Sequence, residues 1–485
     1  MNSMEPTTQQ KASGYLLVLV LVFGAIFFTM TAAFVGYVVT QSHVTKAKYS
    51  KEQALNIAEA GLDYYKWFLA HYPGNVTNGT TTAGPYVHVY TDPEGTDIGE
   101  FSLSIASSTA CGSAYAIDIT STGHTYDNPN ITRTVYGRYA QPTVSEYAYI
   151  INSNVWAGAD RTIIGPYHSN GVIRMDGTNL STVTSGQENW VCDGSISCSP
   201  GATGATVDGV YGGGPNSSFW NFPSTPINFT GLTVDLSAMQ VKAQSGGGQY
   251  IGPSGASGYR VVFKTNGTID VYRVTGTTLY WGYTTEAGWV QERHVISAST
   301  FLANYVIPTS CSIIFVEDKV WLEGVVRGRV TIAAADVDTV GVSPSIILND
   351  NITYANATSG LLAIAEQDVL VGLVVPATLT LNGIFVAQNG RFGRNHYCTN
   401  DCSSTGGNQG LPDALDPYVT RTSLTVNGTI VSNGREGTKW TSGGVFTSGF
   451  NTRTNSYDRK LVADPPPLTP TVSDTYEFIE WREIE

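Results

Sequence analysis

Two short stretches of the 485-residue chain gather side chains that could bind a metal or attack a substrate. The first holds one imidazole, one carboxylate and two thiols, from His396, Asp401, Cys398 and Cys402. Its spacing, His-x-Cys-x-x-x-Cys, matches no established zinc pattern, so we predict a loop closed by a disulfide instead. The second, Tyr167-His168-Ser169-Asn170-Gly171, places an imidazole beside a hydroxyl. Nothing near it supplies an acid that would orient the imidazole, and we predict a corner between strands.

Acidic residues recur near the expected strands and raise the question of an enzyme. The four aspartates are Asp318, Asp338, Asp350 and Asp368. Polysaccharide lyases and hydrolases built on a β-helix gather Asp, Arg or Lys along one groove, so a membrane-tethered carbohydrate-active enzyme is an alternative function. The chain has no Walker loop, no Gly-x-Ser-x-Gly elbow and no His-Glu-x-x-His motif. Because a fold alone does not assign a function, we predict no enzyme, no catalytic residue, no cofactor and no metal.

The chain contains six cysteines: Cys111, Cys192, Cys198, Cys311, Cys398 and Cys402. An even number on a chain poor in charge is typical of an oxidising compartment. Cys192 with Cys198, and Cys398 with Cys402, are close enough in sequence to close small loops. The remaining two would then form a long-range pair. Other connectivities stay open, because sequence alone does not choose among them.

The amino-acid composition restricts the classes of molecule that the chain could bind. Charged residues make up 13% of the chain, which is about half the usual share of a soluble domain. The 52 glycines, with many Thr, Ser and Asn, indicate a neutral, hydroxyl-rich surface of the kind found on secreted β proteins. The formal net charge is -13, and a nucleic-acid binder needs a basic face to displace counterions from phosphates. We therefore expect no nucleic acid among the partners.

The N-terminal part of the chain predicts one long helix over residues 15–72. No formal charge occurs between Lys11 and Lys46, and Tyr15 to Thr40 is dominated by Leu, Val, Phe, Ala and Gly. As a helix this stretch would rise about 39 Å, enough to span a bilayer with some tilt. Apolar residues then recur at helical spacing until Pro73-Gly74 ends the helix. They are Ala54, Ile57, Ala58, Gly61, Leu62, Tyr65, Phe68 and Leu69.

The charges that flank the apolar stretch bear on its orientation. Lys46, Lys48 and Lys51 follow it, whereas only Lys11 precedes it. The positive-inside rule alone would place the C-terminal side in the cytoplasm. The cysteines, the low charge and the β-rich body indicate the opposite, and large domains translocate largely regardless of flanking charge. We predict an anchor in the inner or cytoplasmic membrane, with the body outside the cytoplasm.

The N-terminus resembles that of type IV pilins and pseudopilins. In that class a short polar leader ends in Gly and is followed at once by the hydrophobic half of a long helix. Here the leader would be residues 1–14, cut between Gly14 and Tyr15. The segment Ala54-Leu55-Asn56-Ile57-Ala58-Glu59-Ala60-Gly61-Leu62 resembles the A-x-x-x-A-E-A-G-L/I segment of PilX-type minor pilins. The resemblance covers about the first 70 residues.

The resemblance implies a prepilin peptidase that cuts after Gly14, and other pilin subunits that pack against the helix. Pilins usually carry Glu at the fifth mature position, where it pairs with a neighbour's N-terminus. This chain has Leu19 there. The departure favours a minor, priming or tip subunit over a bulk subunit, and it also fits an anchor that is never cut. Assembly would bring the chain to a pilus or the cell surface.

Beyond the helix the chain predicts strands and turns. Alternating apolar and polar residues over 84–142 predict a small antiparallel sheet packed on the helix end. Short, evenly spaced apolar runs over 143–463, with Asn-Gly or Gly turns, favour a right-handed parallel β-helix; a β-sandwich is the alternative. Residues 176–310 interrupt the pattern and predict an inserted subdomain. Residues 464–485 predict a Pro-rich linker and a final strand that docks back.

Three functions are consistent with these observations. The leading hypothesis is a minor pilin, or a pilus-tip or priming subunit, that displays a large β-rich domain, with adhesion to a surface glycan or protein as its role. The second is an uncut membrane-anchored adhesin or envelope protein with the same body. The third is the membrane-tethered carbohydrate-active enzyme.

Overall fold

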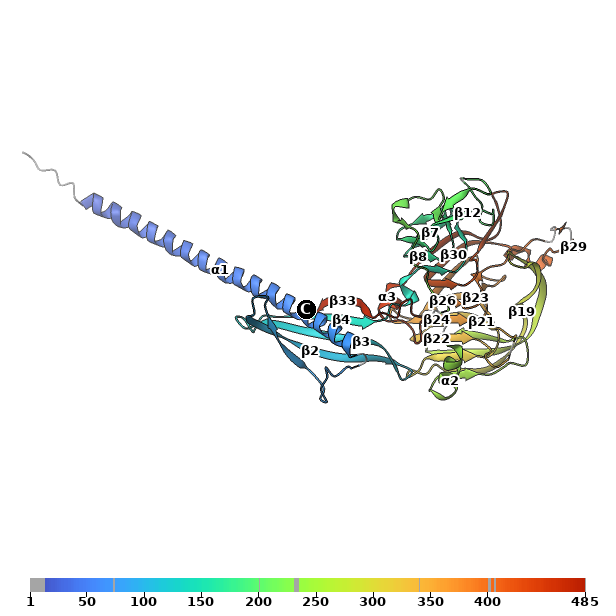
Figure 1. The fold of residues 1–485 in the computed structure, drawn as a ribbon, viewed down its shortest axis with the longest axis horizontal. Helices are drawn as coiled ribbons and strands as arrows, with labels where there is room; N and C mark the ends of the chain where they lie inside the picture. The colour runs from blue at the N-terminus through green and yellow to red at the C-terminus, as the bar shows by residue number, and fades with distance from the viewer. Residues whose placement is uncertain are drawn as a thin grey trace, which may run out of the picture. The chain divides into compact units, whose positions relative to one another are not determined.

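The computed structural model describes residues 14–72, 75–199, 201–230, 235–339, 341–399, 403–404 and 407–484. They form one long N-terminal helix and many strands, so the predicted fold class is confirmed (Figure 1). The chain divides into two compact units. Unit 1 comprises Met1–Ala106, Ile117–Arg138 and Glu480–Glu485, and unit 2 comprises Ser107–Ala116 and Tyr139–Ile479.

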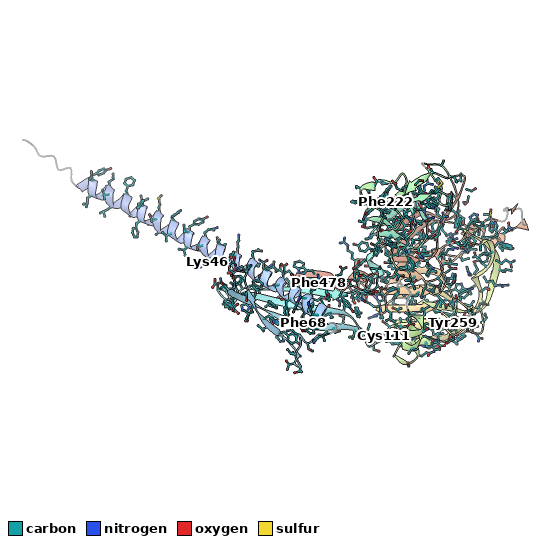
Figure 2. The ribbon with its side chains drawn as sticks, viewed as in Figure 1. Lys46, Phe68, Cys111, Phe222, Tyr259 and Phe478 are labelled. Atoms are coloured by element: carbon teal, nitrogen blue, oxygen red, sulfur yellow. A yellow bond between two sulfur atoms is a disulfide. The ribbon has the colours of Figure 1, made fainter. Side chains whose placement is uncertain are left out.

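Helix α1 (Gly14–His71) is continuous over 58 residues, a rise of about 87 Å. Every residue from Gly14 to Tyr49 is exposed. From Ser50 onward one stripe of the helix is buried, and this stripe contains the apolar residues that recur at helical spacing in the sequence. The two halves therefore differ in what covers them: the second half packs on protein, and the first half does not (Figure 2).

A five-stranded sheet carries the second half of α1. Its strands follow the order β1 (Tyr86–Thr91), β2 (Asp97–Ala110), β3 (Ser113–Thr125), β4 (Thr132–Ala140) and β33 (Glu477–Ile484). β1 and β2 pair antiparallel. β33 comes from the C-terminal end of the chain and lies beside β4, where Arg133 forms an ion pair with Glu483. The C-terminal segment thus returns to the sheet of the first strands.

Unit 2 is built from parallel ladders, in which each strand pairs with a strand of the neighbouring coil. The first ladder contains, in stacking order, β16 (Gln249–Ile251), β20 (Ile313–Val316), β22 (Arg329–Ala334), β24 (Gly360–Ala365), β26 (Thr378–Ala387), β30 (Thr420–Ser432), β5 (Tyr149–Ile151), β8 (Tyr167–Ser169), β11 (Val183–Ser185) and β15 (Trp220–Asn221).

Three further ladders run beside the first. One stacks β17 (Tyr259–Phe263), β21 (Val320–Val326), β23 (Ile346–Tyr354), β25 (Val369–Val371) and β27 (Phe392–Gly393). Another continues from β26 and β30 to β32 (Val445–Ser456), β7 (Arg161–Ile164) and β10 (Thr178–Asn179). The last stacks β6 (Val155–Ala157), β9 (Ile173–Met175) and β14 (Val210–Tyr211). Stacked parallel pairing is what a β-solenoid requires; the right-handed sense of the coil stays a prediction.

The order of the coils differs from the order of the chain. Ile430 on β30 pairs with Tyr149 on β5, and Arg453 on β32 pairs with Arg161 on β7. The first coils of the chain therefore stack on the last ones. Residues 176–310 were predicted to form an inserted subdomain, but strands from this range belong to the ladders. β10, β11 and β15 extend the ladders at one end, and β16 and β17 extend them at the other. Turn-rich loops between these strands hide their coil pattern in the sequence.

The central strands of the first ladder, β20, β22 and β24, are buried on both faces. Ile314, Ile332 and Phe385 face the core shared by the ladders. Their neighbours, such as Phe315 and Ile364, belong to a second apolar cluster. Helix α2 (Leu236–Ser245), helix α3 (Arg459–Ala463) and the Pro-rich segment after α3 supply residues to that cluster. Burial on both faces explains why these strands are continuous apolar runs rather than alternating ones.

The remaining elements connect or flank the ladders. A long antiparallel hairpin joins β18 (Thr268–Thr284) to β19 (Gly288–Val306), and β31 (Lys439–Ser442) pairs with β32. Short antiparallel pairs are β12 (Asn189–Val191) with β13 (Thr206–Asp208) and β28 (Ser403–Ser404) with β29 (Gly407–Asn408). Among the described residues, 3-10 helices span Val144–Glu146, Ser217–Phe219 and Asp413–Tyr418.

Candidate functional site

The first half of α1 is an apolar surface that no other described part of unit 1 covers. By length and composition, helix α1 is long and apolar enough to cross a membrane. Gly14 is its first residue, and the adjoining Tyr15 is 82% exposed. Leu19 is also exposed. The predicted leader, apart from Gly14, lies outside the described residues. An exposed apolar helix of this length needs a lipid or protein environment.

The helix residues predicted to pack are buried against the sheet of their own unit. Gly123 on β3 lies so close to α1 that a Cβ would sit 2.5 Å from the Ala54 carbonyl oxygen and the Ala58 amide nitrogen. Gly61 in turn faces Phe101 and Ser121. Ile57 and Leu62 are at most 3% exposed. Small residues on both elements therefore let the helix backbone approach the sheet, which gives the Ala54–Leu62 segment a structural role.

Two disulfides lie between described residues of unit 2. Cys111, in the turn between β2 and β3, is bonded to Cys311, and Cys192 is bonded to Cys198. Both agree with the pairings considered in the sequence analysis, in which Cys192 and Cys198 close a small loop and Cys111 and Cys311 form a long-range pair. Cys402 and Asp401 lie outside the described residues, so the pairing of Cys398 with Cys402 stays a prediction.

His396 belongs to an aromatic cluster. Its ring lies within 6.4 Å of the rings of Tyr283, Trp289 and Trp440. Burial lowers the pKa of His396 and favours its neutral form. In the part of the chain that the structure describes, no group of three His, Cys, Asp or Glu side chains could hold a metal ion. The backbone of His396 pairs with Tyr283, so this segment holds the long hairpin against the coils.

The His168-Ser169 pair has no catalytic geometry. The His168 ring nitrogens lie 2.9 Å from the Thr184 hydroxyl and from the Asn170 side-chain oxygen. The Ser169 hydroxyl instead donates to the Ser153 carbonyl at 2.7 Å. Both residues lie on β8, within the first ladder. Their hydrogen bonds join neighbouring coils.

A cleft of about 980 Å³ runs between the long hairpin and the corners of the coils. Two of the four aspartates singled out in the sequence line it, Asp318 and Asp368. Both are engaged locally: Asp318 accepts a hydrogen bond from the Ser254 amide (3.0 Å), and Asp368 accepts one from the Arg391 amide (2.8 Å). Asp338 and Asp350 lie elsewhere in unit 2, so the four do not form one acidic groove.

Glu292 is the most buried carboxylate of the cleft. It accepts hydrogen bonds from Asn395 and Tyr397, and His294 lies 3.3 Å away. Burial alone would raise the pKa of Glu292, but its contacts with His294, Asn395 and Tyr397 outweigh burial and hold the pKa below its usual value. Lys319 also lines the cleft, and burial lowers the pKa of its ammonium group. The cleft is therefore polar and mixed in charge.

A smaller recess, of about 510 Å³, adjoins the tip of the hairpin. Its walls include the aromatic side chains of Trp156, Trp440 and Phe446. At its base Asp160 accepts two hydrogen bonds of 2.9 Å from Arg453. Arg391 lines both this recess and the cleft, and so lies between them.

Sequence reasoning missed the recess because its residues are far apart in the chain. They come from β6 and the turn after it, from the hairpin tip, from Arg391 before β27, and from 435–453. The stacking of the last coils on the first ones brings these segments together. No local sequence motif marks these residues.

Comparisons with known proteins add little information about the function of this chain. No family model matches the chain, and no curated protein is a significant match. Among solved structures, the crystal structure of the competence-associated pilin ComZ from Thermus thermophilus is similar at 13% sequence identity. That match covers 90% of this chain and 98% of that chain, with a TM-score of 0.31. Similarity at this level carries no argument about fold or function.

Proposed function

We propose that the chain is a minor subunit of a type IV pilus-like system, which is anchored by α1 and displays unit 2 outside the cell. One observation carries the proposal: α1 is a single helix whose first half is wholly exposed and apolar and whose second half packs on a sheet. The exposed half would lie in the membrane before assembly and against other pilin helices afterwards. Leu19 in place of the usual Glu favours a tip or priming position.

N-terminal sequencing and intact mass of the native protein from its own membranes test the proposal. We expect a mature chain that begins at Tyr15 and appears in the sheared surface fraction. A chain that keeps residues 1–14 and stays with the cells would instead support the uncut surface anchor.

A pair of glycine variants ties this result to processing. A Cβ at Gly14 meets no atom within 4 Å, and the same is true of Gly24. Neither Gly14→Ala nor Gly24→Ala should therefore disturb the packing of α1. We expect Gly14→Ala to retain the leader and Gly24→Ala to be cut normally. Equal cutting of both would contradict a peptidase that reads Gly14.

We further propose that unit 2 binds a ligand rather than turning one over. The support is that the cleft carboxylates already accept hydrogen bonds from neighbouring protein groups, Glu292 from two side chains and Asp368 from a backbone amide. The purified protein should release no product from polysaccharides. Turnover that disappears in both Asp318→Asn and Asp368→Asn would support the carbohydrate-active enzyme instead.

A further inference from the structure

The recess beside the hairpin tip carries an excess of positive charge on a chain whose formal net charge is -13. Four cationic side chains line it: Arg391, Arg435, Lys439 and Arg453. Two carboxylates line it, those of Asp160 and Glu436.

Both carboxylates are already neutralised. Glu436 receives hydrogen bonds of 2.8 and 3.1 Å from Arg161, a buried residue that balances its charge. Asp160 receives two hydrogen bonds from Arg453, and the Lys439 ammonium lies 3.5 Å from it.

Two guanidinium groups remain weakly compensated. Arg435 donates to the Ser195 carbonyl at 2.7 Å and, among the residues described, has no carboxylate at ion-pair distance. Arg391 donates a hydrogen bond to the neutral side chain of Asn395, and its ion pair, at 3.4 Å, is with Glu286, a side chain that is 49% exposed. Solvent weakens such a pair. A partly buried guanidinium without a carboxylate partner favours an anion that completes its hydrogen bonds.

The walls of the recess are apolar rings held in fixed positions. The Trp440 indole N–H donates to the Arg394 carbonyl (2.8 Å), and the Trp156 indole N–H donates to Asp176 (2.7 Å). Both N–H groups are thus engaged with protein, and the rings contribute apolar surface to the recess. Phe446 adds a third ring. Rigid rings present contact area at little cost in conformational entropy.

We infer that the recess binds an acidic sugar, a pyranose ring that carries a carboxylate, as part of a surface polysaccharide. The aromatic walls provide flat apolar surfaces for the ring, and the guanidinium groups fit a planar carboxylate, which arginine binds through two parallel hydrogen bonds. The volume lies within the roughly 300–1,000 Å³ usual for small-molecule sites. The inference rests on the proposed display of unit 2 outside the cell, but the test below uses purified protein and does not depend on filament assembly.

Isothermal titration of the full-length protein in detergent, with oligogalacturonate, tests the inference. Uncharged maltotriose of similar size and inorganic phosphate are the comparison ligands. We expect oligogalacturonate to bind, the other two to bind at least tenfold more weakly, and added salt to weaken the binding. Equal binding of maltotriose would overturn the role of the cations. Equal binding of phosphate, or no binding of oligogalacturonate, would overturn the assignment to an acidic sugar.

Single substitutions place the binding in the recess. Arg435→Gln and Arg391→Gln each remove one weakly compensated guanidinium group, and we expect each to weaken oligogalacturonate binding about tenfold, the effect of one charged hydrogen bond. Lys264→Gln is the matched control, because Lys264 is half-exposed and pairs with Asp270 outside the recess. Thermal melts confirm that each variant is folded. Binding that both recess variants leave unchanged would place the sugar elsewhere and overturn the inference.

Discussion

Arg161 and Glu436 form an ion pair that is cut off from solvent, with each side chain 1% exposed. Arg161 lies on β7, in the first coils of the chain, and Glu436 follows β30, in the last ones. Burial alone would raise the pKa of Glu436, but the Arg161 guanidinium outweighs it and holds the pKa below its usual value. The pair therefore couples the two segments of the ladders at the level of single side chains.

Replacing Glu436 with Gln should leave the Arg161 charge buried without a partner. We expect Glu436→Gln to lower the free energy of unfolding by about 3–5 kcal/mol, as for other broken buried pairs. Urea unfolding of the unmodified protein and of the variant measures this change in the free energy of unfolding. The matched control is Glu286→Gln, whose exposed pair with Arg391 should contribute at most about 1 kcal/mol. Equal losses in the two variants would contradict the importance of burial.

The environment of Glu146 leads us to predict that the free energy of unfolding depends on pH. Burial, with a smaller contribution from the charge of Glu477, raises the pKa of Glu146 to about 7. The folded state therefore binds a proton that the unfolded state has already lost, and stability should fall as the pH rises from about 4.5 to about 7. Thermal melts across this range should show the fall, and Glu146→Gln should remove it. A fall of the same size in the variant would contradict this assignment.

At the scale of elements, two repeated Asn-Gly pairs explain how strands turn a corner without ending. Asn382-Gly383 on β26 stacks in register on Asn427-Gly428 on β30, and the Asn427 amide donates to Asn382 at 2.9 Å. Both glycines have positive φ, of 149° and 141°. The sequence suggested turns here; the structure has bends inside continuous strands, because parallel neighbours keep their hydrogen bonds through the bend.

A side chain at Gly428 should disturb this stack. A Cβ there would collide with the Gly383 carbonyl oxygen, and the backbone conformation disfavours any L-residue. We expect Gly428→Ala to destabilise unit 2 by about 1–3 kcal/mol. Gly437→Ala is the control, because a Cβ at Gly437 meets nothing within 4 Å. Chemical unfolding followed by circular dichroism compares the two; a loss that is no larger at Gly428 would contradict the argument.

The elements themselves were largely predictable from sequence, whereas their stacking was not. α1 follows from a charge-free apolar stretch and then a helical period, both local signals. Runs such as the one from Ser345 to Asp350 predicted strands for similar reasons. The pairing of Ile430 with Tyr149 depends on contacts between residues far apart in the chain, and no local pattern encodes it. The recess was missed for the same reason, since Trp156 and Trp440 meet only after those coils stack.

At the scale of the whole molecule, the Cys111–Cys311 disulfide closes a very large loop, with a sequence separation of 200. The Cys192–Cys198 disulfide has a separation of 6. In the chain-entropy account, the first should stabilise the folded state by about 5 kcal/mol and the second by about 2 kcal/mol. We expect the Cys111→Ser/Cys311→Ser double variant to lose more stability in urea than Cys192→Ser/Cys198→Ser. The reverse ranking would show that loop entropy does not dominate.

The pairing of β33 with β4 also determines when this sheet can be completed during biosynthesis. β4 leaves the ribosome roughly 340 residues before β33 does, a delay of roughly 20 to 70 s at ordinary rates of elongation. Throughout that interval β4 has an unpaired edge, which other strands can capture. The sheet beneath α1 is therefore completed last, although its other strands are made first, and a nascent chain interrupted anywhere in unit 2 would reach the membrane with that edge still open.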